Sequence, residues 1–219
     1  MSNPIPALVR DHLSAETFKC PAGELALDYC NTGQGIRGTR GIEWFNSFGE
    51  LLNWLEATDA VSRKQAAALR KRAERSPEEA GKVFARALAV REAMARVLIA
   101  KTAEQKPLDG DLRLIEREYV HTAPCGRLAP SDHGFHWTVD SEADELDAVL
   151  RPLLESAVSL MTSERIKRLR RCGNTTCYWL FLDQTKNCSR RWCEMKSCGN
   201  LMKVRRHRER KSGERHRAA

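Results

Sequence analysis

The sequence predicts a mainly α-helical protein: a multihelical N-terminal domain with a small β-hairpin, followed by a small C-terminal module of a β-hairpin and a helix. Two observations predict this fold class. Helix-start signals and apolar residues at helical spacing recur through the first 163 residues, and five of the eight cysteines fall between residues 172 and 198. We therefore divide the chain of 219 residues into residues 1–163 and residues 164–219.

Residues 47–100 contain three helix starts, each followed by an amphipathic segment. A Ser with an acidic or amide residue three positions later predicts a capping box, and Pro is favoured at the first helical position. The starts are Ser47 with Glu50, Ser62 with Gln65, and Ser76 with Pro77, and the segments span residues 51–57, 66–75 and 80–100. The spacing of their apolar residues predicts three consecutive helices.

The rest of the first domain predicts two helices with a hairpin between them. The segments are a short helix at 111–120, a hairpin at 121–140 and a helix at 145–161. The hairpin is predicted from Gly and Pro residues that precede FHWTV, a run of strand-forming residues. Ser141 with Asp144 opens the last helix, which we expect to bend at Pro152, because proline lacks the backbone N–H that a helix interior uses.

Residues 23–41 are less regular and predict a short strand or helix followed by a glycine-rich loop. Gly33, Gly35 and Gly38 match the G-x-G-x-x-G pattern of dinucleotide-binding loops. That pattern needs a strand before it and a helix that starts at the third glycine, whereas another loop signal, TRG, follows Gly38. We expect a flexible loop here rather than a nucleotide site.

Asp28, Asn31 and Thr32 lie beside this loop, at the edge of the apolar stretch LALDYCNT. They form a candidate binding site for a small molecule. The alternative is that they are helix-end or turn residues, since Asp, Asn and Thr are favoured in turns. The histidines show no H-x-x-x-H spacing and no Ser lies in G-x-S-x-G, so the sequence does not indicate an enzyme.

The composition indicates a globular protein without a membrane span. Apolar residues make up 42% of the chain, no apolar run approaches the roughly 18 residues of a transmembrane helix, and the N-terminus shows no secretory signal. We therefore expect a cytoplasmic protein. In that reducing compartment, clustered cysteines hold metal more often than they form disulfides.

The cysteine-rich segment predicts one structural zinc ion per chain. Cys172 and Cys177 form a C-x4-C pair, and Cys193 and Cys198 form a second pair with the same spacing, fifteen residues further on. Structural zinc prefers four thiolates delivered as two close pairs, and four cysteines leave no open position for a catalytic water. The C-terminal module is therefore expected to be a zinc-bound β-hairpin-and-helix module.

The hairpin of this module is expected between the two cysteine pairs, with YWLFL (178–182) as a strand, DQTKN (183–187) as the turn and CSRRW (188–192) as the returning strand. The spacing Cys188-x4-Cys193 is also compatible with a pair, but it would leave Cys198 without a partner. We expect Cys188 to be a free thiol. Gly173 and Gly199 each follow a cysteine, where a tight turn around a metal favours a residue without Cβ.

The basic character of the chain belongs to its last quarter. Residues 164–219 contain 17 Lys and Arg against 5 Asp and Glu, whereas residues 1–163 contain 20 against 24. A helix after Cys198 would display cations around most of its surface, and phosphate is their natural counter-charge. The candidate nucleic-acid contacts are Arg190, Arg191, Lys203, Arg205, Arg206, Arg208 and Arg210.

Two stretches resemble known families. RCGNTTCYWLFLDQTKNCSRRWCEMKSCGNLMKVRRHRER closely resembles the CGNR zinc finger of bacterial regulators, and GELALDYCNT with the LLNWL helix resembles the ABATE domain that accompanies this finger. The resemblance covers nearly the whole chain. It implies a stress-induced transcriptional regulator whose N-terminal domain senses a small molecule and whose finger binds double-stranded DNA. It also places the zinc ligands on Cys172, Cys177, Cys193 and Cys198.

This chain departs from the family pattern at a few positions. Leu201 stands where the family has the Arg of CGNR, so Lys203 or Arg205 would have to replace any phosphate contact of that Arg. Cys188 stands where Arg or Gly is common, and Tyr29-Cys30 replaces the usual Phe-Val.

The leading hypothesis is a ligand-responsive DNA-binding regulator. Such a regulator would benefit from forming a homodimer, because two half-sites lengthen the DNA site that one small finger can read. The alternative is a zinc-dependent RNA- or protein-binding module without ligand sensing. An enzyme with a site around Asp28 and Asn31 is a third hypothesis, for which no base and nucleophile can be named together.

Overall fold

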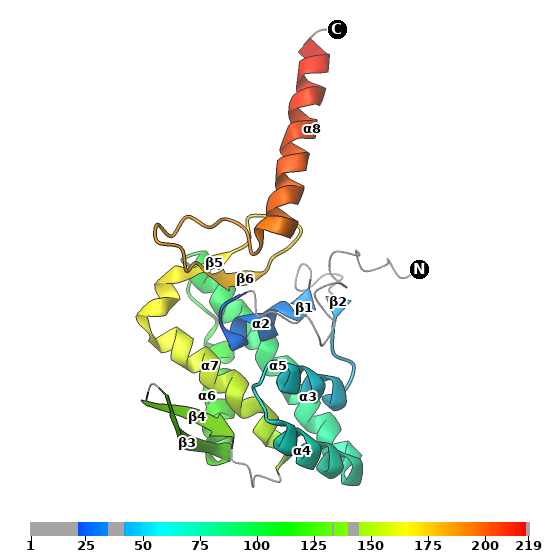
Figure 1. The fold of residues 1–219 in the computed structure, drawn as a ribbon, viewed down its shortest axis with the longest axis vertical. Helices are drawn as coiled ribbons and strands as arrows, with labels where there is room; N and C mark the ends of the chain where they lie inside the picture. Colours follow the sequence, from blue (N-terminus) through cyan, green and yellow to red (C-terminus); the bar gives the residue numbers. More distant parts are fainter. Residues whose placement is uncertain (1–21, 35–41, 133, 140–144, 218–219) are drawn as a thin grey trace.

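The computed structural model describes residues 22–34, 42–132, 134–139 and 145–217. The body is a helical bundle built around α5 (Pro77–Thr102), which contacts α2 (Leu25–Asn31), α3 (Phe48–Ala57), α4 (Arg63–Arg75) and α6 (Asp109–His121). A final body helix, α7 (Arg151–Thr162), packs on α2 and α6 (Figure 1). The predicted fold class, a multihelical domain followed by a small hairpin-and-helix module, is confirmed.

The predicted helix starts are found, with differences in how each is capped. Ser62 and Gln65 form the full capping box, while the side chain of Ser47 accepts from the Glu50 amide at 3.2 Å. The Glu50 carboxylate turns away from Ser47 and accepts from the backbone of Asn46 at 2.7 Å. The start of α5 relies on Pro77 in its first turn instead of a side-chain cap.

The bend predicted at Pro152 is replaced by a change of helix type. A 3₁₀ segment, η2 (Leu146–Leu150), leads directly into α7, and Pro152 lies in the first turn of that helix. At this position its missing N–H would have had no helical partner, so the helix is not broken. The predicted cap of Ser141 with Asp144 lies outside the described residues.

Each described sheet is a two-stranded antiparallel ladder. The predicted hairpin at 121–140 is present: a 3₁₀ turn, η1 (Ala123–Cys125), precedes β3 (Gly126–Ser131), which pairs with β4 (Gly134–Val139). A second ladder joins β1 (Gly33–Gln34) to β2 (Ile42–Glu43). Of the three glycines in the dinucleotide pattern, Gly35 and Gly38 lie outside the described residues, and Gly33 follows helix α2 rather than the strand that the pattern requires.

The hairpin of the C-terminal module differs from the predicted one. β6 (Leu180–Leu182) pairs antiparallel with β5 (Leu169–Arg171), a strand that precedes it in the chain and follows the 3₁₀ segment η3 (Glu164–Arg168). Residues 188–192, the predicted partner, are not a strand. The first cysteine pair therefore lies in the turn of the hairpin rather than before it. All three residues of β6 are buried and this strand also contacts helix α2, so it lies against the body rather than pairing with residues 188–192.

The chain ends in a helical projection. A π-helical turn, η4 (Met195–Gly199), continues into α8 (Asn200–Arg217), which extends away from the rest of the molecule (Figure 1). Within the described residues, no helix combines the length and the apolar character that crossing a membrane requires.

Candidate metal centre and nucleic-acid interface

Four cysteine sulfurs gather at one point between β5, β6 and η4. The Sγ atoms of Cys172, Cys177, Cys193 and Cys198 all lie within 4.8 Å of one another, and Cys193 Sγ is 3.6 Å from both Cys177 Sγ and Cys198 Sγ. Sulfurs at about 2.3 Å from a tetrahedral zinc ion lie about 3.8 Å apart. The donor set and its spacing thus fit one structural zinc ion, and these are the four residues predicted from the sequence.

The four thiols affect one another's pKa values. Hydrogen bonds from Cys177, Cys193 and Cys198 lower the pKa of Cys172, which makes this thiol the first to ionise. Hydrogen bonding to Cys172 then raises the pKa of Cys177 and of Cys193, because further ionisation would crowd negative charge into the same volume. A divalent cation at the centre removes that repulsion and allows all four thiols to ionise.

Polar groups orient the sulfurs. The backbone N–H of Cys193 donates to Cys172 Sγ at 3.5 Å, and the Asn174 amide donates to Cys198 Sγ at 3.4 Å. Asn174 is buried, and its Oδ1 accepts from the backbone and hydroxyl of Thr176 at 3.2 and 3.0 Å. Asn174 therefore shapes the turn between Cys172 and Cys177 and also contacts a ligand of the second pair.

Gly173 and Gly199 are required by close packing rather than by unusual backbone angles. Neither has a positive φ, but a Cβ on Gly173 would lie 3.0 Å from the Trp192 ring and 3.2 Å from the Arg191 carbonyl. A Cβ on Gly199 would lie 3.2 Å from the same indole and 2.4 Å from Met195 Sδ. Both glycines thus let the Trp192 indole pack closely against the two cysteine turns.

Cys188 lies outside the metal cluster, as predicted. It is half-buried and occupies the left-handed region with φ of 48°, in the loop that connects β6 to the second cysteine pair. It forms no disulfide with the other described cysteines. A left-handed, non-glycine residue marks a sharp turn here.

This loop is organised by Asp183, which is fully buried. Its carboxylate accepts from the Thr185 amide at 2.9 Å, the Thr185 hydroxyl at 2.5 Å and the Arg190 amide at 2.8 Å. Burial alone would raise the pKa of Asp183, but these hydrogen bonds outweigh it and hold the pKa below its usual value. Asp183 and Asn174 were missed as functional residues; the signal was an Asx residue two positions before Thr, which occurs at both places.

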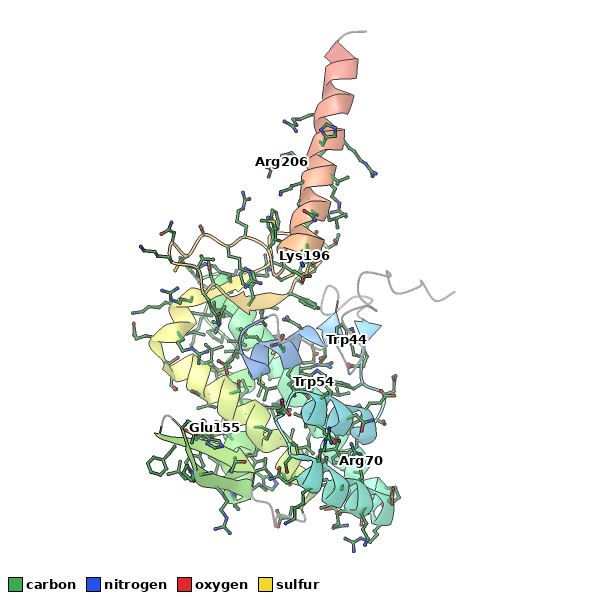
Figure 2. All side chains as sticks on the ribbon, in the orientation of Figure 1. Trp44, Trp54, Arg70, Glu155, Lys196 and Arg206 are labelled. Carbon is green, nitrogen blue, oxygen red and sulfur yellow. The ribbon has the colours of Figure 1, made fainter. Side chains whose placement is uncertain are left out.

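The candidate nucleic-acid contacts fall into two groups. Arg190 is occupied inside the module: its Nε donates to the Trp192 carbonyl at 2.9 Å, its Nη2 donates to the Cys193 carbonyl, and its guanidinium lies 4.5 Å from the Phe181 ring centroid. We therefore leave Arg190 out of the contact surface. Arg191 is exposed and lies over the Trp192 ring. The remaining cations are on α8: Lys203, Arg205, Arg206, Arg208 and Arg210 (Arg206 is labelled in Figure 2).

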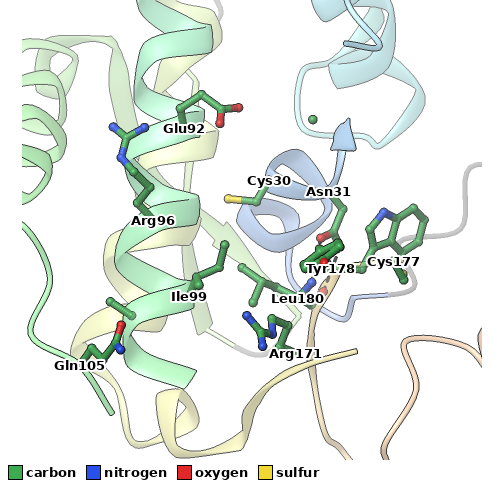
Figure 3. Close-up of a pocket in the computed structure, with 13 residues that line it drawn as sticks. Cys30, Asn31, Glu92, Arg96, Ile99, Gln105, Arg171, Cys177, Tyr178 and Leu180 are labelled. Atoms are coloured by element: carbon green, nitrogen blue, oxygen red, sulfur yellow. Dashed lines mark hydrogen bonds between the residues drawn. The ribbon is translucent and has the colours of Figure 1, made fainter. Parts of the chain in front are cut away.

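The three candidate ligand residues have different hydrogen-bond partners in the structure. Asp28 is buried and accepts from the Ala22 amide at 3.2 Å. Thr32 is buried, donates to the Tyr29 carbonyl at 2.6 Å and accepts from Arg91 at 3.2 Å. Asn31 lines the pocket of Figure 3, whereas Asp28 and Thr32 are not among the described residues that line it. Asp28 and Thr32 thus have the helix-end roles of the alternative interpretation.

Asn31 also joins the body to the cysteine module. Its amide donates to the Leu180 carbonyl and accepts from the Leu180 N–H, both at 2.9 Å. Two residues further along β6, the Leu182 N–H donates to the Ala22 carbonyl at 2.8 Å. Because β5 occupies one edge of β6, Asn31 and Ala22 cover the other edge. The metal-binding module is therefore docked on the body through β6.

Comparison with known families agrees with this architecture. Residues 23–164 match the ABATE family, described as "Putative stress-induced transcription regulator", and residues 168–211 match the CGNR zinc finger. Neither is a family of enzymes. No curated protein matches the chain. The chain therefore belongs to the ABATE family and carries a CGNR zinc finger after its ABATE domain.

Proposed function

We propose that this protein is a transcription regulator in which residues 164–219 bind double-stranded DNA and residues 1–163 sense a small molecule. The observation that carries the proposal is the connection between the metal centre and α8. Cys198 lies in η4, and α8 begins two residues later at Asn200. Zinc therefore fixes the root of a basic helix that projects from the molecule (Figure 1).

The distribution of cations on α8 suits a duplex groove. At 100° per residue, Lys203, Arg206 and Arg210 fall within about 60° of one another, and Arg205 and Arg208 form a second stripe on roughly the opposite side. An α-helix fits the major groove of B-DNA, which has a phosphate backbone along each wall. Two opposed cation stripes can approach both walls at once, whereas a single strand offers one backbone.

The test is DNA binding by the zinc-loaded protein across a salt series. The logarithm of the affinity should fall linearly with the logarithm of salt concentration, with a slope of about −0.9 for each neutralised phosphate. Replacing Lys203, Arg206 and Arg210 by Gln should reduce that slope by about 2 to 3. The matched control replaces three exposed cations of α4, Arg63, Lys64 and Lys71, by Gln, and should leave the slope unchanged.

RNA of the same length and sequence is the comparison that addresses the alternative function. Tighter binding to RNA than to duplex DNA, or binding without salt dependence, contradicts the proposal. The first of these results would instead support an RNA-binding module. Leu201, which replaces the family Arg, is half-buried in the first turn of α8, so we assign the phosphate contacts to the exposed cations that follow it.

We further propose that two copies associate through the β3–β4 hairpin. Leu128 and Trp137 are cross-strand partners, as are Pro130 and Phe135, so all four share one face of the hairpin. Leu128, Phe135 and Trp137 are 60%, 74% and 51% exposed, which makes this apolar face unusual for a surface. Sedimentation should show a dimer that Phe135→Glu converts to a monomer; a wild-type monomer at DNA-binding concentrations contradicts this assembly.

A further inference from the structure

A pocket lies at the junction between the body and the metal-binding module (Figure 3). It has a volume of about 480 Å³, within the usual range for small-molecule sites. One wall is the α5 segment from Glu92 to Ala100, and the facing wall is formed by Asn31 and residues 177–180. The pocket thus includes Cys177, one of the four zinc ligands, as well as the residue pair that docks β6 on the body.

One cation of the pocket can bind an anionic ligand group. Arg96 is held by Asp111 through bonds of 2.6 and 2.9 Å, and Glu92 accepts from Arg91 at 3.1 Å, so both are engaged with body residues. Arg171 also lines the pocket, is exposed, and forms no ion pair within the described part of the chain. Its guanidinium is therefore available to bind a carboxylate.

The remaining lining favours an apolar ligand body. Ile99 and Leu180 line the space from opposite walls, and Tyr178 lines the same wall as Leu180 (Figure 3). Trp179 also lines the pocket, and its indole packs edge-on against Trp44, with 6.3 Å between the ring centroids. An aromatic ring flanked by these side chains would leave its carboxylate near the rim, where Arg171 lies.

The wall formed by residues 177–180 is linked to the zinc centre by the backbone and by hydrogen bonds. Tyr178 follows Cys177 directly and has φ of 62°, a left-handed conformation that costs free energy for a residue with a side chain. The Trp179 carbonyl accepts from the Cys172 N–H at 2.8 Å, and Leu180 is bound at both backbone groups by Asn31. A ligand that presses on residues 178–180 therefore acts on both the cysteine turn and the docking contact.

We propose that this junction pocket binds a small aromatic carboxylate and that binding changes the position of the zinc finger on the body, and with it the affinity of α8 for DNA. The DNA part of this inference rests on the proposed function. Binding of the carboxylate specifies the ligand of the proposed sensor, and its effect on the zinc site can be measured without DNA. By linkage, the factor by which the ligand changes DNA affinity equals the factor by which DNA changes ligand affinity.

The ligand class is tested by calorimetry on the full, zinc-loaded chain with benzoate as the probe and benzylamine as its cationic counterpart. Benzoate should bind, and benzylamine should bind at least tenfold more weakly. Arg171→Gln should weaken benzoate binding at least tenfold, and Arg171→Glu should reverse the preference towards benzylamine. Arg171 is exposed, so these variants should fold, and Arg63→Gln on α4 is the matched control with unchanged binding.

The coupling is tested with two separate readouts. Saturating benzoate should change the rate at which a chelator removes zinc by at least threefold, and it should change the affinity for duplex DNA by at least threefold. Loss of the DNA effect in a protein that does not bind DNA at all counts against the proposed function, while the zinc rate still tests the pocket. Benzoate binding that persists in Arg171→Glu overturns the site, and binding without any change in the zinc rate overturns the coupling.

Discussion

The side chain of Asn31 binds Leu180 as a neighbouring strand would, donating to its carbonyl and accepting from its N–H at 2.9 Å each. Asn31 ends helix α2 of the ABATE domain, and Leu180 begins strand β6 of the zinc finger. One amide therefore satisfies two backbone groups that would otherwise form an open sheet edge. Together with the contact between Ala22 and Leu182, this contact ties the orientation of the finger to the body.

Replacing Asn31 by Ala should destabilise the docking of the finger. Two backbone groups of Leu180 lose their partners, and leaving a buried polar group unpaired costs about 1–3 kcal/mol. Urea unfolding followed by circular dichroism should show a loss of about 2–4 kcal/mol, together with faster amide hydrogen exchange at Leu180. The exposed Asn187→Ala is the control. Unchanged exchange at Leu180 would show that this contact does not hold β6.

Asp183 makes the finger sensitive to acid in a defined direction. Its pKa is lowered in the folded state, so the ionised carboxylate contributes stability above its unfolded pKa of about 3.9, and that contribution is lost as pH falls through the lower, folded value. Asp183→Asn should cost about 1–3 kcal/mol near neutral pH, by loss of hydrogen bonds to a charged acceptor.

The pH dependence supplies the control for that variant. With excess zinc present, the difference in unfolding free energy between wild type and Asp183→Asn should be constant from pH 7 to about pH 5 and should shrink below about pH 4. A difference that instead shrinks between pH 7 and pH 6 would assign the effect to another titrating group.

The zinc site predicts different outcomes for two neighbouring cysteines. Cys198→Ser should lower the zinc content from one ion per chain and melt the finger, since structural zinc contributes on the order of 10–16 kcal/mol of binding free energy to small domains. Cys188→Ser should keep one zinc per chain, because Cys188 lies outside the four-sulfur cluster. Metal analysis of both purified proteins checks this, and zinc loss in Cys188→Ser would contradict the assignment of ligands.

A separate prediction concerns the backbone strain at Cys188. Its φ of 48° is unfavourable for a residue with a side chain, and Asn tolerates this conformation better than most residues. Cys188→Asn should therefore be neutral or stabilise the finger by up to about 1 kcal/mol. The midpoint of urea unfolding measures this, with Cys188→Val as the β-branched comparison that should lower it. Equal midpoints for Asn and Val would argue against strain at this turn.

The elements that could be predicted are those whose cause is local. Repeated cysteine spacing identified the four ligands, and capping and periodicity identified the helices around Ser62 and Pro77. The strand that pairs with β6 could not be predicted. The position of β6 depends on its contact with Asn31, which lies 149 residues away in the sequence. The role of Arg190 could not be predicted either. In the sequence it is one cation of a basic run, and only the folded structure brings it to the backbone carbonyls that it binds.

If α8 binds duplex DNA as proposed, its sequence preference should reside on the face between its two cation stripes. Asn200, Val204 and His207 fall within about 60° of one another on that face, whereas Glu209 lies on the opposite side, where it would avoid the DNA. Amide and imidazole groups can bind base edges, and an aliphatic side chain can contact a thymine methyl group.

Selection from a random duplex pool should return a narrower consensus for wild type than for the variant with Val204→Ala and His207→Ala. The salt slope of that variant should stay unchanged, because no phosphate contact is removed. Glu209→Gln should instead raise affinity for all duplexes by a similar small factor. If the double variant selects the wild-type consensus and loses salt dependence, these residues contact phosphates and the base-reading face lies elsewhere on the helix.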